Sequence, residues 1–182
     1  MAEPESAVGM GSPLEGGVGG CYSSPGSAGV PHANKILVLG VGNPFRRDDG
    51  IGPAVISHLK SEWRFTDSKV DLLDGGIDGL SLIDCIEGYE KVLVVDAVDM
   101  GAVPGEVRMF SPEEAKLTIK ADTLSTHGFG LAEVIALMEK LEMKPDMHII
   151  GIQAKDVNFG EGMSPEVSSK IEEILKLIKE HL

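Results

Sequence analysis

The chain has 182 residues and a formal net charge of −13, which together suit one acidic globular domain. This charge argues against nucleic acids and anionic membranes as partners, because both attract positively charged surfaces. The two cysteines have no CxxC spacing, and no apolar run reaches the ~20 residues that span a bilayer, so we expect a cytoplasmic protein without a cysteine zinc site.

Residues 1–34 differ in composition from the rest of the chain. Glycine, proline and serine supply 17 of these 34 residues. Such a segment buries too little apolar surface to offset the entropy that it would lose on ordering. We therefore predict a flexible tail over 1–34 and a single α/β domain over 35–182, and we expect that domain to act as a monomer.

From Lys35 onward, apolar runs alternate with helical patterns. Continuous apolar runs at 35–41, 70–73 and 91–97 predict strands that are buried on both faces of a sheet. After the first run, one apolar stripe at helical spacing predicts a helix; it consists of Ile51, Ala54, Val55 and Leu59. A shorter helix is expected over 80–86.

The second half of the chain continues the alternation. Residues 106–110 alternate in polarity and predict an edge strand, whereas 147–152 predict another buried strand. Two further stripes predict helices; they consist of Leu131, Val134, Ile135 and Met138, and of Ile171, Ile174, Leu175 and Ile178. We expect Ser164 and Pro165 to be the N-cap and first residue of the last helix.

This order of elements predicts the fold class. Strands that alternate with helices form right-handed βαβ units, and these stack into a three-layer α/β sandwich around a twisted, mostly parallel sheet. Ligands of such sheets bind beyond the carboxyl ends of the strands. Functional residues are therefore sought where the predicted strands end.

The first predicted strand ends in a glycine-containing loop that carries two acidic residues. Gly40 and Gly42 match the first two glycines of a dinucleotide fingerprint, but Phe45 takes the place of the third. Asp48 and Asp49 then open the following helix, where a phosphate would be repelled. Acidic residues at this position often only cap the helix. Two adjacent ones point in different directions, so at least one could serve another purpose.

Two other predicted strands also end in aspartate. Asp96 follows four apolar residues, and a bare carboxylate in such surroundings is costly unless it is paired or binds a cation. A turn or cap is the structural alternative for Asp96. Asp74 precedes Gly75 and Gly76, which favours a turn. Asp78 and Asp99 are interpreted as ordinary loop residues.

One of the five histidines stands out by position. His127 lies in a glycine-flanked loop just before the helix that begins near Leu131. The others are in the tail, in predicted helix or strand, or near the C-terminus; they are His32, His58, His148 and His181. Two carboxylates and one imidazole would suit zinc, nickel or another divalent cation with open positions for water or substrate.

These residues together resemble a known family, the [NiFe]-hydrogenase maturation endopeptidases. The resemblance begins in 37–43 and continues, in order, through Asp48–Gly52, Asp74–Gly76, Val95–Ala97, Ser125–His127 and Gly130–Leu131. It covers roughly residues 35–180 and leaves out the tail. It implies a five-stranded twisted sheet flanked by helices, in the manner of phosphorylase/hydrolase-like folds.

The resemblance also implies a function and a site. It implies a metal-dependent peptidase, of aspartic or metallo type, that removes a C-terminal extension from a hydrogenase large-subunit precursor once nickel is installed. Carried over residue by residue, the catalytic and metal-facing groups are Asp49, Asp96 and His127, and the nickel arrives with the substrate. The ion or one of these groups would activate water. The sequence contains no HExxH or G-x-S-x-G motif that would offer another mechanism.

Three alternatives are weaker. A peptidyl-tRNA hydrolase also begins with Gly-x-Gly-Asn-Pro, but it should be basic and carry a histidine shortly after that motif. A nucleotide-binding domain is disfavoured by Phe45. A non-cleaving nickel chaperone or checkpoint of hydrogenase assembly would show the same residues as the peptidase, and this alternative stays open at the level of sequence.

Overall fold

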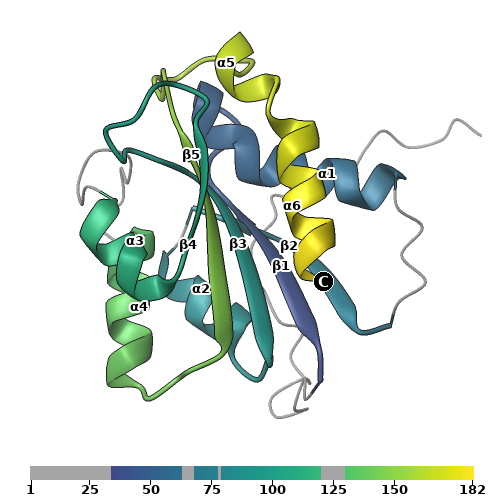
Figure 1. Ribbon diagram of the computed structural model, residues 1–182, viewed down its shortest axis with the longest axis vertical. Coiled ribbons are helices and arrows are strands. Elements are labelled where there is room, and N and C mark those ends of the chain that lie inside the picture. The colour runs from purple at the N-terminus through teal and green to yellow at the C-terminus, as the bar shows by residue number, and fades with distance from the viewer. Residues whose placement is uncertain (1–33, 63–67, 78, 120–129) are drawn as a thin grey trace, which may run out of the picture.

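A five-stranded sheet forms the centre of the molecule in the computed structural model, which describes residues 34–62, 68–77, 79–119 and 130–182 (Figure 1). The spatial order is β2-β1-β3-β5-β4; the first four strands run parallel and β4 is antiparallel to β5. The strands are β1 (Ile36–Val41), β2 (Val70–Gly76), β3 (Lys91–Val98), β4 (Val107–Phe110) and β5 (Asp146–Gln153). All five predicted strands are confirmed, and β4 is an edge strand as expected.

Helices cover both faces of the sheet, which confirms the three-layer sandwich (Figure 1). On one face lie α1 (Ile51–Glu62), α6 (Ile171–His181) and the short α5 (Pro165–Ser168). On the other lie α2 (Gly79–Ile86), α3 (Pro112–Thr118) and α4 (Leu131–Lys140). Every helix among the described residues is too short or too polar to span a bilayer.

The continuous apolar runs arise because the central strands are covered on both sides. In β1, Leu37 and Leu39 pack with the α2–α4 layer, whereas Val38 packs with α1 and α6. All three side chains are fully buried. Full burial of such a side chain contributes roughly 1.5–3 kcal/mol, so the strands are held mainly by these two apolar layers.

Two helical features differ from the sequence-based expectations. The short α3 was not predicted, although Ser111 and Glu114 form a capping box at its start. The prediction that Ser164 and Pro165 begin the last helix was wrong. They begin the separate α5, and the Ser164 hydroxyl donates to Asp48 instead of capping the helix. The helix predicted by the last apolar stripe begins at Ile171 as α6.

A close approach between two glycines places the start of α1 against the sheet. A Cβ on Gly52 would lie 2.2 Å from the Val41 carbonyl oxygen and 2.7 Å from that of Val95. A Cβ on Gly40 would lie 2.4 Å from the Gly52 carbonyl oxygen. Because neither residue has a side chain, the start of α1 lies directly on the carboxyl ends of β1 and β3.

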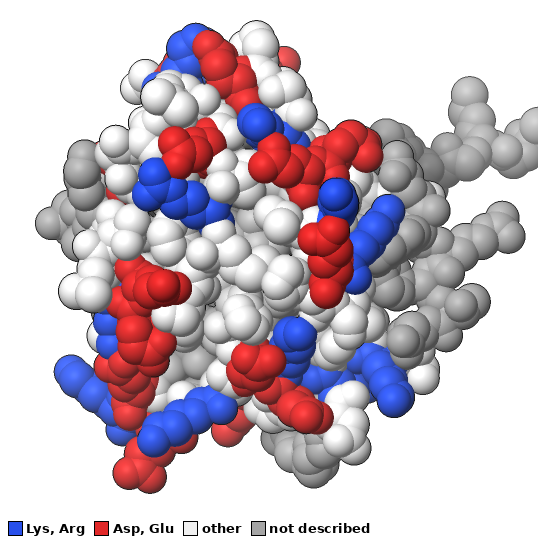
Figure 2. Space-filling view, in the orientation of Figure 1, with Lys and Arg blue, Asp and Glu red and all other residues white. Residues whose placement is uncertain are grey.

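Both signs of charge occur on the molecular surface. Figure 2 shows acidic side chains interspersed with basic ones on one face. Several lysines and arginines of the described part are paired with carboxylates, for example Lys170 with Glu173 at 2.8 Å and Arg47 with Asp156 at 3.3 Å. The view shows no broad basic patch over the described residues of this face, in keeping with the acidic composition.

Candidate active site

The loop from β1 to α1 is folded tightly around Asp49. Gly42 has a φ of 130°, and a Cβ there would lie 1.9 Å from the Asp49 carbonyl oxygen. The chain then forms the one-turn 3-10 helix η1 (Arg47–Gly50), which leads directly into α1. This loop lies at the carboxyl edge of the sheet, the upper edge in Figure 1. The loop thus lies at the edge where functional residues were sought from the sequence.

The two adjacent aspartates of η1 have different surroundings. Asp48 is fully buried, and its carboxylate accepts hydrogen bonds from the backbone N–H groups of Lys155, Asp156 and Ser164 at 2.6–2.9 Å. The Ser164 hydroxyl also donates to it at 3.0 Å. Asp48 therefore ties η1 to the segment between β5 and α5, and its carboxylate is committed to structure.

The Asp49 carboxylate accepts fewer hydrogen bonds than that of Asp48, and it lies near the carboxylate of Asp96. Its Oδ2 accepts a hydrogen bond from the Asn43 N–H at 3.1 Å, and the residue as a whole is 9% exposed. Burial raises the pKa of Asp49, although the Asn43 N–H and the charge of Arg46 oppose that rise. Of the two residues, Asp49 has the carboxylate with fewer hydrogen bonds to the rest of the described chain.

Asp96 lies near the carboxyl end of β3, and the structure brings it together with Asp49. Burial is the main cause that raises the pKa of Asp96 well above its usual range, and the negative charge of Asp49 raises it further. A hydrogen bond from the Ala97 N–H opposes the rise. The charge of Asp49 thus disfavours the ionised form of Asp96, and carboxyl groups with such shifted pKa values are common in active sites.

The third predicted site residue, His127, lies outside the described residues. Within the described part, no cluster of three or more His, Cys, Asp and Glu side chains could hold a metal ion. Of the three residues predicted to face a metal, Asp49 and Asp96 thus lie in the described part of the chain and His127 does not. The His127 assignment stays a prediction.

The remaining acidic candidates serve turns. The Asp74 carboxylate accepts from the Gly76 N–H at 3.0 Å, as the turn interpretation predicted. Asp99 accepts from the Gly101 N–H at the same distance. Asp78 lies outside the described residues.

The histidines in the described part lie in regular structure. His58 is in α1, and His148 is in β5 next to Asp146, with Nε2 at 3.2 Å from the carboxylate. The His148 and His181 rings are 5.9 Å apart at their centroids. Both residues lie toward the edge where the strands begin, away from Asp49. His32 lies outside the described residues.

The backbone of the first loop argues against a phosphate-binding role. The Gly42 N–H donates to the Gly76 carbonyl oxygen at 3.0 Å, and the Asn43 N–H donates to Asp49. These two amides are therefore already paired within the chain. The missing side chain of Gly40 makes room for the Gly52 backbone, not for a ligand.

Gln153 is a buried polar residue at the end of β5 that the sequence analysis overlooked. Its Oε1 accepts from the N–H groups of Met100 and Ala102 at 2.9 and 3.0 Å, which fixes the segment after β3. The signal in the sequence was a single amide at the end of the apolar run of β5.

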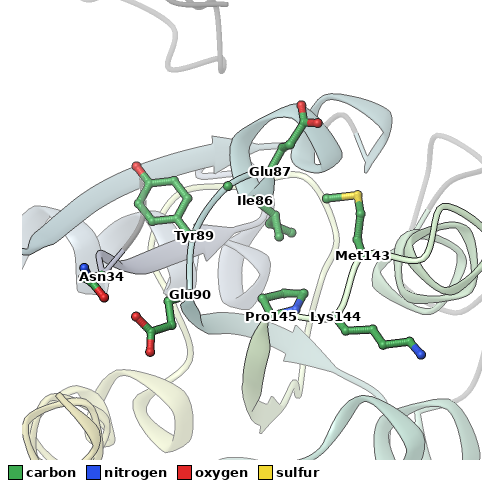
Figure 3. Close-up of a pocket in the computed structure, with 9 residues that line it drawn as sticks. Asn34, Ile86, Glu87, Tyr89, Glu90, Met143, Lys144 and Pro145 are labelled. Carbon is green, nitrogen blue, oxygen red and sulfur yellow. The ribbon is translucent and has the colours of Figure 1, made fainter. Parts of the chain in front are cut away.

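A separate hollow of about 560 Å³ lies at the opposite edge of the sheet (Figure 3). Asn34, Glu90 and Pro145 line it, just before the starts of β1, β3 and β5. Because parallel strands present their functional residues at the other edge, this hollow is not part of the site around Asp49.

With this geometry, comparison with known proteins decides the family. A model of the hydrogenase maturation protease family matches residues 53–181. The chain belongs to this family. Membership makes it a protease of hydrogenase maturation and confirms the resemblance found in the sequence. The matched range contains Asp96 but begins after Asp49.

Individual proteins that are similar to this chain agree with this assignment. The hydrogenase expression/formation protein HupD of Thiocapsa roseopersicina is 33% identical over 150 residues, which are 81% of this chain and 67% of that protein. The chain is also similar to the solved structure of the hydrogenase maturating endopeptidase HybD from E. coli. That structure has a TM-score of 0.70 and 27% identity, over 79% of this chain and 89% of that one.

A third similarity is to another solved structure. The [NiFe] hydrogenase maturation protease HycI from Thermococcus kodakarensis has a TM-score of 0.63 and 28% identity, over 81% of this chain and 91% of that one. The hydrogenase maturation protease family thus accounts for nearly all of the described fold. Membership in this family favours a protease over the peptidyl-tRNA hydrolase, nucleotide-binding and non-cleaving checkpoint alternatives.

Proposed function

We propose that this protease removes a C-terminal extension from a hydrogenase large-subunit precursor after nickel has been inserted, and that Asp49, Asp96 and His127 bind the nickel of that substrate. The observation that carries the proposal is the proximity of Asp49 and Asp96 at the carboxyl edge of the sheet. The charge of Asp49 raises the pKa of Asp96, so the ionised pair is unfavourable without a cation.

A divalent ion suits this pair on electrostatic grounds. Cations near two carboxylates favour their ionised forms, and carboxylate oxygen is an acceptable ligand for nickel and zinc. A precursor that carries its metal would therefore bind better than one that lacks it. The protease would then cut only the matured precursor, because recognition would depend on the metal.

Asp49 and Asp96 would also support hydrolysis of the peptide bond. Without a cation the pKa values of Asp49 and Asp96 are raised, and a bound cation would favour their ionised forms. An ionised carboxylate can accept a proton from water. One of the two would orient the attacking water and take its proton, while the other holds the substrate in register.

Cleavage of a nickel-loaded precursor by the purified protease, followed by intact-mass spectrometry, tests this function. The wild-type protein should shorten the precursor, and Asp49→Asn, Asp96→Asn and His127→Ala should each lower the rate by about 100-fold or more. Asp146→Asn, at the opposite edge of the sheet, is the matched control and should cut normally. If the wild-type protein binds the precursor but never shortens it, the non-cleaving checkpoint is the better hypothesis. Full processing by all three variants would reject the proposed site.

A further inference from the structure

Exposed apolar side chains gather at the edge of the sheet that carries Asp49. Eight large hydrophobic residues are exposed in the described part of the chain. Five of them follow the carboxyl ends of β1, β2, β3 and β5; they are Phe45, Ile77, Leu80, Val103 and Phe159. Single exposed apolar residues are ordinary, but this concentration beside one site is the pattern of a binding surface.

The two phenylalanines come from loops that are joined to each other. The Gly160 N–H donates to the Phe45 carbonyl oxygen at 3.0 Å, and the Arg47 N–H donates to the Gly160 carbonyl oxygen at 3.3 Å. Phe45 is nevertheless 67% exposed and Phe159 76% exposed. The backbone therefore holds both rings in place while leaving them open to solvent.

Arg46 strengthens the connection between the two loops. Its Nε donates to the Val157 carbonyl oxygen at 2.9 Å, and its guanidinium carbon lies 5.4 Å from the centroid of the Phe159 ring. An arginine over the face of a ring is a cation–π contact. Aromatic residues and arginine are also the residue types that most often dominate the energy of protein interfaces.

The same frame supports the candidate active site. The Asp49 N–H donates to the Arg46 carbonyl oxygen at 3.0 Å, and Asp48 holds the loop that leads to Phe159 through the N–H groups of Lys155 and Asp156. The hydrogen bonds that position the two aromatic loops therefore also position the backbone of Asp49. A chain bound on the two rings would lie beside the carboxylates.

We propose that Phe45 and Phe159, braced by Arg46, bind an apolar segment of the precursor next to the bond that is cut. This inference rests on the proposed function, and it assigns the substrate contact that the carboxylates cannot provide. A protease has to hold a polypeptide along the edge that carries its reacting groups, and these two rings belong to the exposed apolar surface of that edge. A second copy of the chain seated there would obstruct the edge.

The test is a set of rate measurements over a range of precursor concentrations. Phe45→Ala and Phe159→Ala should each raise KM by about tenfold and the double variant by more, with kcat nearly unchanged, since removal of substrate contacts leaves the reacting groups in place. Leu117→Ala and Leu141→Ala remove exposed leucines elsewhere and should change neither constant. Thermal melts should be alike for all four single variants, because these side chains are exposed.

The outcomes separate this inference from the proposed function. If the wild type cuts the precursor and the double variant cuts it with the same KM, the aromatic surface is not the substrate contact and the proposed function stands. If the wild type does not cut the precursor, calorimetry can measure how tightly each protein binds the precursor. Equal affinity of the wild type and the double variant for the precursor would then overturn the inference. A wild-type dimer that the double variant loses would assign the surface to self-association and also overturn it.

Discussion

Asp48 and Asp49 are consecutive residues, yet their carboxylates have different hydrogen-bond partners and different surroundings. That of Asp48 accepts four hydrogen bonds from Lys155, Asp156 and Ser164, whereas that of Asp49 accepts one from Asn43 and lies near Asp96. The first carboxylate is satisfied by the protein itself. The second is left in an unfavourable environment, which is common where a protein uses a group for chemistry.

This contrast predicts opposite effects of substitution on stability. Asp48→Ala should lower the free energy of unfolding by about 3 kcal/mol or more, because it leaves several buried N–H groups without their charged acceptor. Asp49→Asn should leave the stability unchanged or higher. Urea denaturation of both variants at neutral pH measures the difference, and an equal loss in both would contradict the separation of roles.

The raised pKa of Asp96 predicts a difference in stability between the wild type and Asp96→Asn that depends on pH. Because the folded pKa lies above the ordinary value of 3.8, the folded state binds the proton more tightly, and stability falls as the pH rises from that value through the folded pKa. Asp96→Asn removes this loss. Its melting temperature should exceed that of the wild type at neutral pH, by about 2–4 °C for each kcal/mol recovered.

The gain from Asp96→Asn should shrink as the solution is acidified. Near pH 4 the wild-type carboxyl is protonated in the folded state, so the two proteins should melt at nearly the same temperature. Calorimetric scans between about pH 4 and pH 8 provide the comparison. A constant difference across this range would show that burial of the charge is not its source.

The close approach of α1 to the sheet predicts strong intolerance at Gly52. Gly52→Ala would place a methyl group 2.2 Å from the Val41 carbonyl oxygen, so α1 would have to move away from β1 and β3. We expect a loss of about 3 kcal/mol or more, despite the better helix propensity of alanine. Precursor cleavage should fall as well, since η1 and Asp49 move with α1.

Gly162→Ala is the control for that substitution. Nothing lies within 4 Å of a Cβ at this position, although its φ is +78°. The cost should therefore be limited to the conformational preference, about 1–2 kcal/mol. A smaller loss for Gly52→Ala than for Gly162→Ala, measured by urea denaturation, would contradict the packing argument.

The capping box of α3 predicts a modest effect. The Ser111 hydroxyl accepts from the Glu114 N–H at 3.2 Å, and the Glu114 carboxylate accepts from the Ser111 N–H at 2.8 Å. Ser111→Ala should cost about 1 kcal/mol. Ser168→Ala, at a half-buried serine in α5, should change the melting temperature little; a similar loss in both would mean that the box is not the cause.

The sequence by itself determined the elements and the edge at which to seek the site. Strands such as 35–41 and helices such as 131–138 are specified by patterns of neighbouring residues, because burial on two faces or on one stripe is a local requirement. The short α3 and α5 carry no long apolar stripe, so α3 was missed and α5 was joined to α6. The family resemblance pointed to Asp49 and Asp96.

Only the tertiary structure decided which residues meet. Nothing near Asp48 in the sequence indicates that its hydrogen-bond donors lie more than 100 residues away, and nothing near Phe45 indicates that Phe159 stands in the adjoining loop. Such contacts depend on the strand order β2-β1-β3-β5-β4, which places the ends of β1, β3 and β5 along one edge. Local patterns report what a segment buries, whereas the choice of its neighbour is made by the packing of the whole sheet.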